Sequence, residues 1–368
     1  MRTLFFSLVV AQTIAACTAR ESPEGAGGSS GTGASVGGGG SGGGEAWAAV
    51  SARVEAAASE NGVADLGLYV FDETDQRVYA LELGAFRSST NIAVASASKL
   101  VSGMVLFDVI RRGALTLDST PGQVLGWIGP TADLTLKHLL SFTSGLDPEP
   151  PCTHSLLTTL EACVDNIGTT AAIAAPGARF DYGPSHLHVA ARMAEVATGK
   201  SWDALFDEVF RAPLQLASDA RYYTLPKQSS GEDNPLVAGG LRVSTDEYAK
   251  LLSVAYHRGN GTVGTPELFD LQSIEPYPNC EIGNSPVQAL GYSYRYGLTA
   301  WLECDTPADG CAVFSSPGAY GFTPWIDREH RYYAMLAMEI TSTGAVVAFA
   351  VELAQSVQPL IVEALQQQ

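Results

Sequence analysis

Residues 94–113 read V-A-S-A-S-K-L-V-S-G-M-V-L-F-D-V-I-R-R-G, and the rest of the chain is organised around this stretch. Its apolar side chains recur at helical spacing and surround the predicted helix almost completely, so the helix belongs in a core. Gly113 suits the C-terminal cap of such a helix. Ser96 lies in the first turn, and Lys99 follows three residues later on the same face.

A serine at the N-terminal end of a buried helix, one turn from a lysine, can be a nucleophile beside its general base. This chemistry requires that burial lowers the pKa of the Lys99 amine, so that the amine can lose its proton. The same pair also fits a core helix with a capping serine and a lysine whose amine reaches solvent. Partner groups farther along the chain decide between the two interpretations.

The first 17 residues have the features of an export signal: an early arginine, a short apolar run and small residues before Cys17. This segment resembles a bacterial lipoprotein signal, which implies cleavage before Cys17, a lipid on its thiol and an outer-membrane anchor. An ordinary secretory signal is the alternative. Residues 18–45 are mostly Gly, Ser, Ala and Thr, so we expect a flexible tether.

Residues 46–368 are long enough for one large domain or two closely packed ones. The formal net charge of -18 argues against nucleic acid or an anionic membrane surface as the main partner. We therefore expect membrane contact only through the N-terminal lipid anchor. Oligomeric state is open, with a monomer favoured.

The cysteines after position 17 predict disulfides in an exported protein. Cys152 and Cys163 could close a short loop, and Cys304 and Cys311 flank a predicted turn. Cys280 would then be left over, although a pairing of Cys280 with Cys304 is also open. No cysteine pair has C-x-x-C spacing, so a zinc site is not expected.

Strand patterns lie near both ends of the folded part, and helices lie between them. A predicted hairpin pairs two strands near the N-terminus, and four more strands precede a long apolar C-terminal helix. The predicted strands are 66–72, 77–83, 294–303, 311–316, 322–327 and 332–340. This order predicts an α+β fold, with an antiparallel sheet built from both chain ends and a large, mainly helical insertion. The predicted α/β part is 46–92 with 286–368, and the helical part is 93–285. Within the latter, a helix is predicted over 185–198 with Ser185 as its N-cap.

Five short motifs occur in the same order as in a known family. They are Ser96-Ala97-Ser98-Lys99, the run L-L-S-F-T-S-G-L at 139–146, Tyr182-Gly183-Pro184, Gly239-Gly240-Leu241 and Ser316-Pro317-Gly318. Together they resemble the landmarks of the penicillin-recognising serine hydrolases. The likeness is strongest to the class C β-lactamase-like branch, which includes D-alanyl-D-alanine peptidases and a group of carboxylesterases. It covers the chain from Trp47 to its end.

The resemblance implies a role for each matching residue. Ser96 would be the nucleophile that becomes acylated, and Lys99 would be its general base. Tyr182 would relay the proton to and from the leaving group. The backbone N–H groups of Ser96 and Ala319 would form an oxyanion hole, in which each donor is typically worth about 2.7–4 kcal/mol.

Substrate contacts are implied for Pro184, Ser316 and Gly318, and two of these depart from the family pattern. Pro184 replaces the asparagine of the Tyr-x-Asn motif, which would bind a substrate amide. Ser316 stands where β-lactamases and peptidases usually have the lysine or histidine that holds a substrate carboxylate. Phe142 likewise replaces a histidine found in many relatives. Gly318 is retained and suits a close approach of the backbone.

These departures favour ester hydrolysis through an acyl-enzyme, with a small acyl substrate, no cofactor and no metal. A class C-like β-lactamase and a D-alanyl-D-alanine carboxypeptidase are the alternatives. A tethered binding module with little turnover is an alternative of another class. The joint presence of Ser96, Lys99 and Tyr182 favours an enzyme, because a binding module has no need of a lysine beside a helix-terminal serine. The expected location is the bacterial cell envelope.

Overall fold

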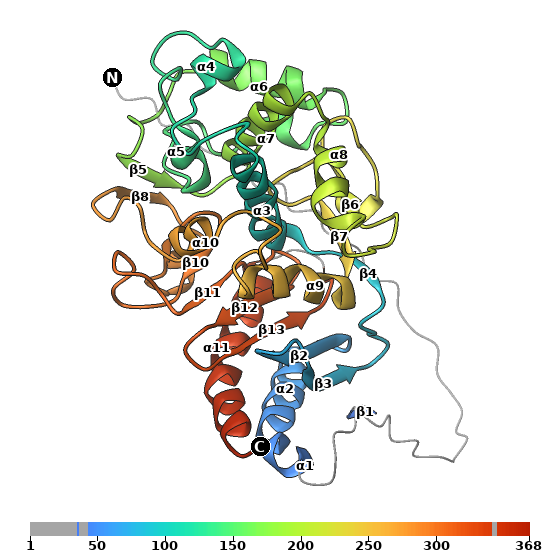
Figure 1. Cartoon of the computed structure of the whole chain (residues 1–368). Coiled ribbons are helices and arrows are strands. Elements are labelled where there is room, and N and C mark those ends of the chain that lie inside the picture. Colours follow the sequence, from blue (N-terminus) through green and yellow to red (C-terminus); the bar gives the residue numbers. More distant parts are fainter. Residues whose placement is uncertain (1–34, 37–42, 341–343) are drawn as a thin grey trace, which may run out of the picture. The chain divides into compact units, whose positions relative to one another are not determined.

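The central sheet of the molecule is built from both ends of the chain. The computed structural model describes residues 35–36, 43–340 and 344–368. Eight strands form one antiparallel sheet in the order β1-β3-β2-β13-β12-β11-β10-β9 (Figure 1). In that order the strands are Ser35–Val36, Arg77–Leu83, Leu66–Asp72, Tyr332–Ala337, Thr323–Asp327, Val313–Ser315, Trp301–Leu302 and Arg295–Tyr296. The predicted α+β class is confirmed.

The hairpin of β2 and β3 has the predicted bounds because one carboxylate organises its turn. The Oδ1 atom of Asp72 accepts hydrogen bonds from the backbone N–H groups of Thr74 at 2.8 Å and Gln76 at 3.0 Å. Asp75 has a φ of +65°, a left-handed conformation that aspartate tolerates better than most residues. The turn therefore follows from side chains that are local in the sequence.

One face of the sheet is covered by α2 (Ala48–Glu60) and α11 (Gly344–Gln366), which lie side by side (Figure 1). Their apolar side chains form one of two hydrophobic cores with residues of β2, β3 and β13. Within the described part of the chain, α11 is the one helix that could cross a membrane by length and composition. Its buried residues pack in this core instead.

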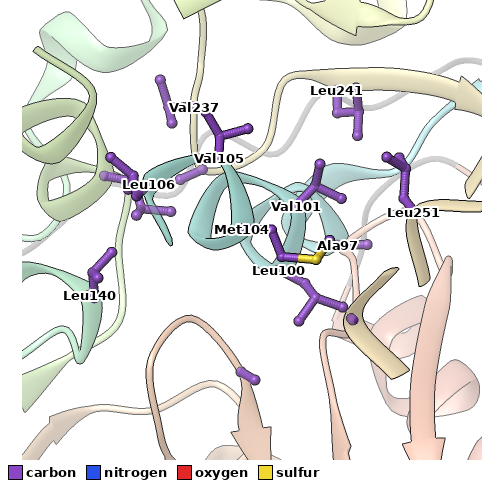
Figure 2. Packing of buried hydrophobic residues seen from close by; sticks show 14 of the residues in the cluster. Ala97, Leu100, Val101, Met104, Val105, Leu106, Leu140, Val237, Leu241 and Leu251 are labelled. Atoms are coloured by element: carbon purple, nitrogen blue, oxygen red, sulfur yellow. The ribbon is translucent and has the colours of Figure 1, made fainter. Parts of the chain in front are cut away.

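The opposite face of the sheet packs against the helical part of the chain, whose central element is α3 (Ser98–Arg111). One turn of 3-10 helix, Ala95–Ala97, precedes α3, so Ser96 lies in that turn and not in the α-helix. Every residue from 98 to 109 is buried, as the apolar pattern predicts. Figure 2 shows α3 packed among side chains from distant segments: Leu140, Val237, Leu241 and Leu251.

The remaining elements surround α3 and include two small sheets. The helices are α4 (Pro121–Leu125), α5 (Leu136–Leu140), α6 (Leu160–Thr169), α7 (Ser185–Thr198), α8 (Trp202–Phe206), α9 (Thr245–Tyr256) and α10 (Pro266–Gln272). The strands are β4 (Asn91–Ala93), β5 (Arg179–Asp181), β6 (Arg221–Tyr222), β7 (Leu241–Ser244) and β8 (Glu281–Asn284). β4, β7 and β6 pair antiparallel, whereas β5 and β8 pair in parallel.

Two local predictions are wrong. The segment 294–303 is not one strand, because β9 and β10 are separated by a tight turn in which Thr299 has a φ of +64°. Ser185 does not cap α7, because Pro184 already has helical dihedrals and takes the N-cap position. The Ser185 hydroxyl has no hydrogen-bond partner among the described residues.

Two elements fall inside the range predicted as a flexible tether. Ser35–Val36 forms β1 against β3, and Gly43–Ala46 forms the short helix α1. Extended backbone at the edge of a sheet can pair whatever its side chains are, so composition gives no signal for β1. Cys17 and its predicted lipid anchor lie outside the described residues.

The two predicted disulfides are confirmed. Cys152 bonds to Cys163, and Cys304 bonds to Cys311, whereas Cys280 forms no disulfide within the described residues. The first bond links the segment before α6 to α6 itself. The pair of disulfides indicates a protein that matures in an oxidising compartment, either the periplasm or the extracellular space.

Removal of the first disulfide should destabilise the fold. The double variant Cys152→Ala/Cys163→Ala opens a loop that spans 11 positions, which lowers the free energy of unfolding by about 3 kcal/mol through the entropy of the unfolded chain. Urea unfolding of the full chain measures the change. Cys280→Ser is the matched control and should keep the midpoint near that of the wild type. Equal midpoints for the double variant and the control would contradict the prediction.

Candidate active site

Ser96 is presented by a strained turn at the start of α3. The preceding residue, Ala95, has a φ of +47°, a left-handed conformation that is unfavourable for alanine. The Ser98 hydroxyl stabilises this turn, since it donates a hydrogen bond to the Ala95 carbonyl at 2.6 Å and accepts one from the Leu241 N–H at 3.1 Å. The strain is therefore held in place by a neighbouring strand, and the Ser96 side chain stays partly exposed.

The Lys99 amine lies beside Ser96 and is almost fully buried, with 4% of the residue exposed. Nζ donates hydrogen bonds to Ser96 Oγ at 2.9 Å and to the Ala238 carbonyl at 2.7 Å. Burial lowers the pKa of Lys99 to about 7, and the negative charge of Glu149 acts in the opposite direction. At neutral pH a large fraction of the amine is uncharged and can accept the Ser96 proton.

Tyr182 completes this cluster from the loop between β5 and α7. Its ring lies under the Lys99 amine, with Nζ 4.5 Å from the ring centroid, and it stacks on Trp301 at 5.1 Å. Burial raises the pKa of Tyr182 to about 12, while hydrogen bonding to Ser96 and Trp301 acts in the opposite direction. Tyr182 thus carries its proton at neutral pH and can donate it.

Two residues that the sequence analysis did not identify hold Tyr182 in place. Asn284 on β8 accepts a hydrogen bond from the Tyr182 N–H at 2.9 Å and donates one from Nδ2 to the Tyr182 carbonyl at 2.7 Å. His186 is buried and bonds to the Asp181 carbonyl at 2.8 Å. Burial lowers the pKa of His186 to about 4, so its ring is neutral. Only the tertiary fold brings Asn284 to the tyrosine, because about 100 residues separate them.

Phe142 supports the same region from the loop after α5. Its φ is +58°, a strained value for an aromatic residue, and its carbonyl accepts a hydrogen bond from the Asp181 N–H at 3.0 Å. The ring stacks on His186 at 4.8 Å and tilts against Tyr182 at 5.5 Å. Phe142 therefore packs beneath the site and supplies no charged or polar side chain to it.

The segment between β11 and β12 closes the other side of the site. The Ser316 hydroxyl donates a hydrogen bond to the Ser96 carbonyl at 3.0 Å. A Cβ atom at Gly318 would lie 2.2 Å from the Val94 carbonyl, so only glycine fits at this position. Ala319 follows directly and is partly exposed. In the described part of the chain, the Ala319 N–H donates no hydrogen bond, so it is free to bind a substrate oxygen.

The predicted residues fall into two groups. Ser96, Lys99 and Tyr182 meet as predicted, with the 316–319 segment beside them. Pro184 is buried at the start of α7, where it has a structural position. Among the described residues, no group of three or more His, Cys, Asp or Glu side chains could hold a metal ion.

Comparison with known proteins agrees with this geometry. A family model described as Beta-lactamase matches residues 52–357. The chain belongs to the beta-lactamase family. Its structural neighbours lie in the wider superfamily of penicillin-recognising serine hydrolases.

Three solved structures illustrate the range of this beta-lactamase family fold. A candidate beta-lactamase from Bacteroides dorei DSM 17855 is 26% identical, covers 85% of this chain and 98% of its own, and has a TM-score of 0.73. A mutant of simvastatin synthase from Aspergillus terreus is 17% identical, with coverages of 88% and 98% and a TM-score of 0.67. EstCE1, a hydrolase with promiscuous acyltransferase activity, is 16% identical, with coverages of 83% and 98% and a TM-score of 0.64. No curated protein matches the chain.

The pKa of Lys99 predicts a pH dependence for this beta-lactamase family site. Only the neutral amine can accept the Ser96 proton, so the reactivity of Ser96 should rise as the pH increases through about 7 and then level off. The rate constant for labelling of Ser96 by a fluorophosphonate, measured from about pH 5 to about pH 9, checks this. Lys99→Ala is the control and should label slowly throughout. A wild-type rate that is flat across the range would show that Lys99 is not the base.

Proposed function

We propose that this protein is a serine hydrolase that acts on esters of small acyl groups through an acyl-enzyme at Ser96. The observation that supports this most directly is the 2.9 Å contact between Ser96 Oγ and the buried Lys99 amine. A lysine that is uncharged near neutral pH is an effective general base for a serine hydroxyl.

The chemical steps follow from the positions of these groups. Neutral Lys99 accepts the Ser96 proton while Oγ attacks the ester carbonyl carbon. The resulting oxyanion is stabilised by the N–H groups of Ser96 and Ala319. Tyr182 donates its proton to the leaving alkoxide and regains a proton from Lys99, which leaves the acyl group on Ser96. Water then attacks the acyl-enzyme with the same groups acting in reverse.

Esters are favoured over β-lactams and peptides by the residues around Ser96. Ser316 supplies no positive charge for a substrate carboxylate, and its hydroxyl is already donated to the Ser96 carbonyl. Pro184 supplies no side-chain amide. A hydrolase with acyltransferase activity and a synthase also share the fold, which is consistent with acyl chemistry outside the β-lactams.

β-Lactam hydrolysis is the second candidate, because the matching family model and the neighbour from Bacteroides dorei carry that designation. A D-alanyl-D-alanine carboxypeptidase would use the same Ser96 chemistry on a peptide. We further propose that export ends with a lipid on Cys17, so that the enzyme works on small substrates at the cell envelope. The disulfides support the export step.

Substitutions in the cluster test the proposed function. Ser96→Ala and Lys99→Ala should abolish hydrolysis of a short-chain chromogenic ester, because they remove the nucleophile and its base. Tyr182→Phe should lower kcat by about 10²–10⁴-fold, the range expected for loss of a proton donor. Thermal unfolding midpoints serve as the control and should not fall.

A chromogenic cephalosporin provides the contrasting substrate. Ester turnover that requires Ser96, with an inert cephalosporin, supports the esterase. Fast cephalosporin turnover would reassign the protein as a β-lactamase. Full ester activity in Lys99→Ala would overturn the mechanism.

A further inference from the structure

We propose that the Glu149 carboxylate, on the loop that packs against the Tyr182 segment, makes the enzyme discriminate against acyl groups that carry a carboxylate. Neutral and cationic esters would then be its substrates. The inference rests on the proposed function, since it concerns the substrate class of the same site. It arises from the loop after α5, which the chemistry described above does not use.

This loop is in direct contact with the segment that carries Tyr182. The Ser185 N–H donates a hydrogen bond to the Pro148 carbonyl at 3.3 Å. A Cβ atom at Gly183 would lie 2.2 Å from the same carbonyl oxygen, so the two backbones touch. Glu149 is therefore one residue from a backbone contact beside the catalytic tyrosine.

The backbone of this loop is restrained on both sides of Glu149. Prolines flank Glu149 at 148 and 150, and its N–H donates a hydrogen bond to Asp147 Oδ1 at 3.1 Å. The Thr153 hydroxyl donates one to the Pro150 carbonyl at 2.9 Å, and the disulfide of Cys152 follows. The backbone at Glu149 is therefore held beside the segment that carries Tyr182.

The charge of Glu149 is poorly neutralised. Its side chain is 59% exposed, and its nearest ion-pair partner among the described residues is His154, with Nε2 at 3.8 Å from Oε2. Its field reaches the site, because it acts to raise the pKa of both Lys99 and Tyr182. Lysine at position 316 would oppose this field in a β-lactamase, but the residue here is serine.

One weakly paired charge near the site should change rates by a modest factor. A single charge near a protein surface changes the rate for a charged substrate by roughly threefold to tenfold. Dissolved salt screens this interaction. The expected order of kcat/KM is therefore cationic, then neutral, then anionic acyl groups. The anionic ester should fall roughly threefold to tenfold below its neutral counterpart at low salt.

The test uses the full chain and three p-nitrophenyl esters of similar length with neutral, hemisuccinate and trimethylammonio-butanoyl acyl groups. The kcat/KM ratio of the cationic to the anionic ester is measured at low and high salt for the wild type, Glu149→Gln and Glu149→Lys. Glu60→Gln on α2 is the matched control, because it removes one negative charge from an exposed residue on the other face of the sheet. The ratio should fall toward one in Glu149→Gln, invert in Glu149→Lys and stay at the wild-type value in Glu60→Gln.

A ratio that is the same in Glu149→Gln and the wild type would overturn the inference while leaving the esterase intact. Failure of the proposed function is distinguishable, since no ester would then be turned over in a Ser96-dependent manner. In that event, rates of Ser96 labelling by cationic and anionic phosphonate probes replace the turnover ratio, with the same expected order among the variants. Equal probe ratios, or no labelling of Ser96 at all, would overturn the inference.

Discussion

The buried Lys99 amine is the constraint on which the rest of this structure depends. Because α3 is surrounded by apolar side chains, the amine is removed from water and its pKa falls to about 7. In the part of the chain that the structure describes, the hydrogen bonds of this amine go to Ser96 Oγ and the Ala238 carbonyl. An apolar residue would suit this buried helix better. Lys99 therefore lowers the folding stability while it provides an amine that can be neutral.

Lys99 contacts its partner residues where the sheet packs against the helical part of the chain. Segments far apart in sequence contribute Ser96, Tyr182 and residues 316–319, which lie between β11 and β12. Their spacing depends on close backbone contacts, such as that of Gly318 with the Val94 carbonyl. Strained dihedrals at Ala95 and Phe142 occur in the same region, where packing from both sides can hold them.

The fold is shared across the family, whereas we propose that substrate choice depends on a few charges near Ser96. In our proposal, the absence of a cation at Ser316 and the presence of Glu149 disfavour a substrate carboxylate. Neither change alters the sheet or α3. Membership of the family therefore leaves the substrate open, and electrostatics at these two positions is the physical basis for deciding it.

Local sequence determined the hairpin of β2 and β3, the buried helix α3 and the approach of Ser96 to Lys99, because turn chemistry and helical periodicity act over a few residues. It also predicted the short-range disulfides, whose partners are close in the chain. Tertiary structure alone decided that Asn284 holds Tyr182, that 294–303 breaks into two strands, and that the loop carrying Glu149 packs against the Tyr182 segment. These features depend on contacts between segments whose sequences carry no signal of one another, so only the packed chain could bring them together.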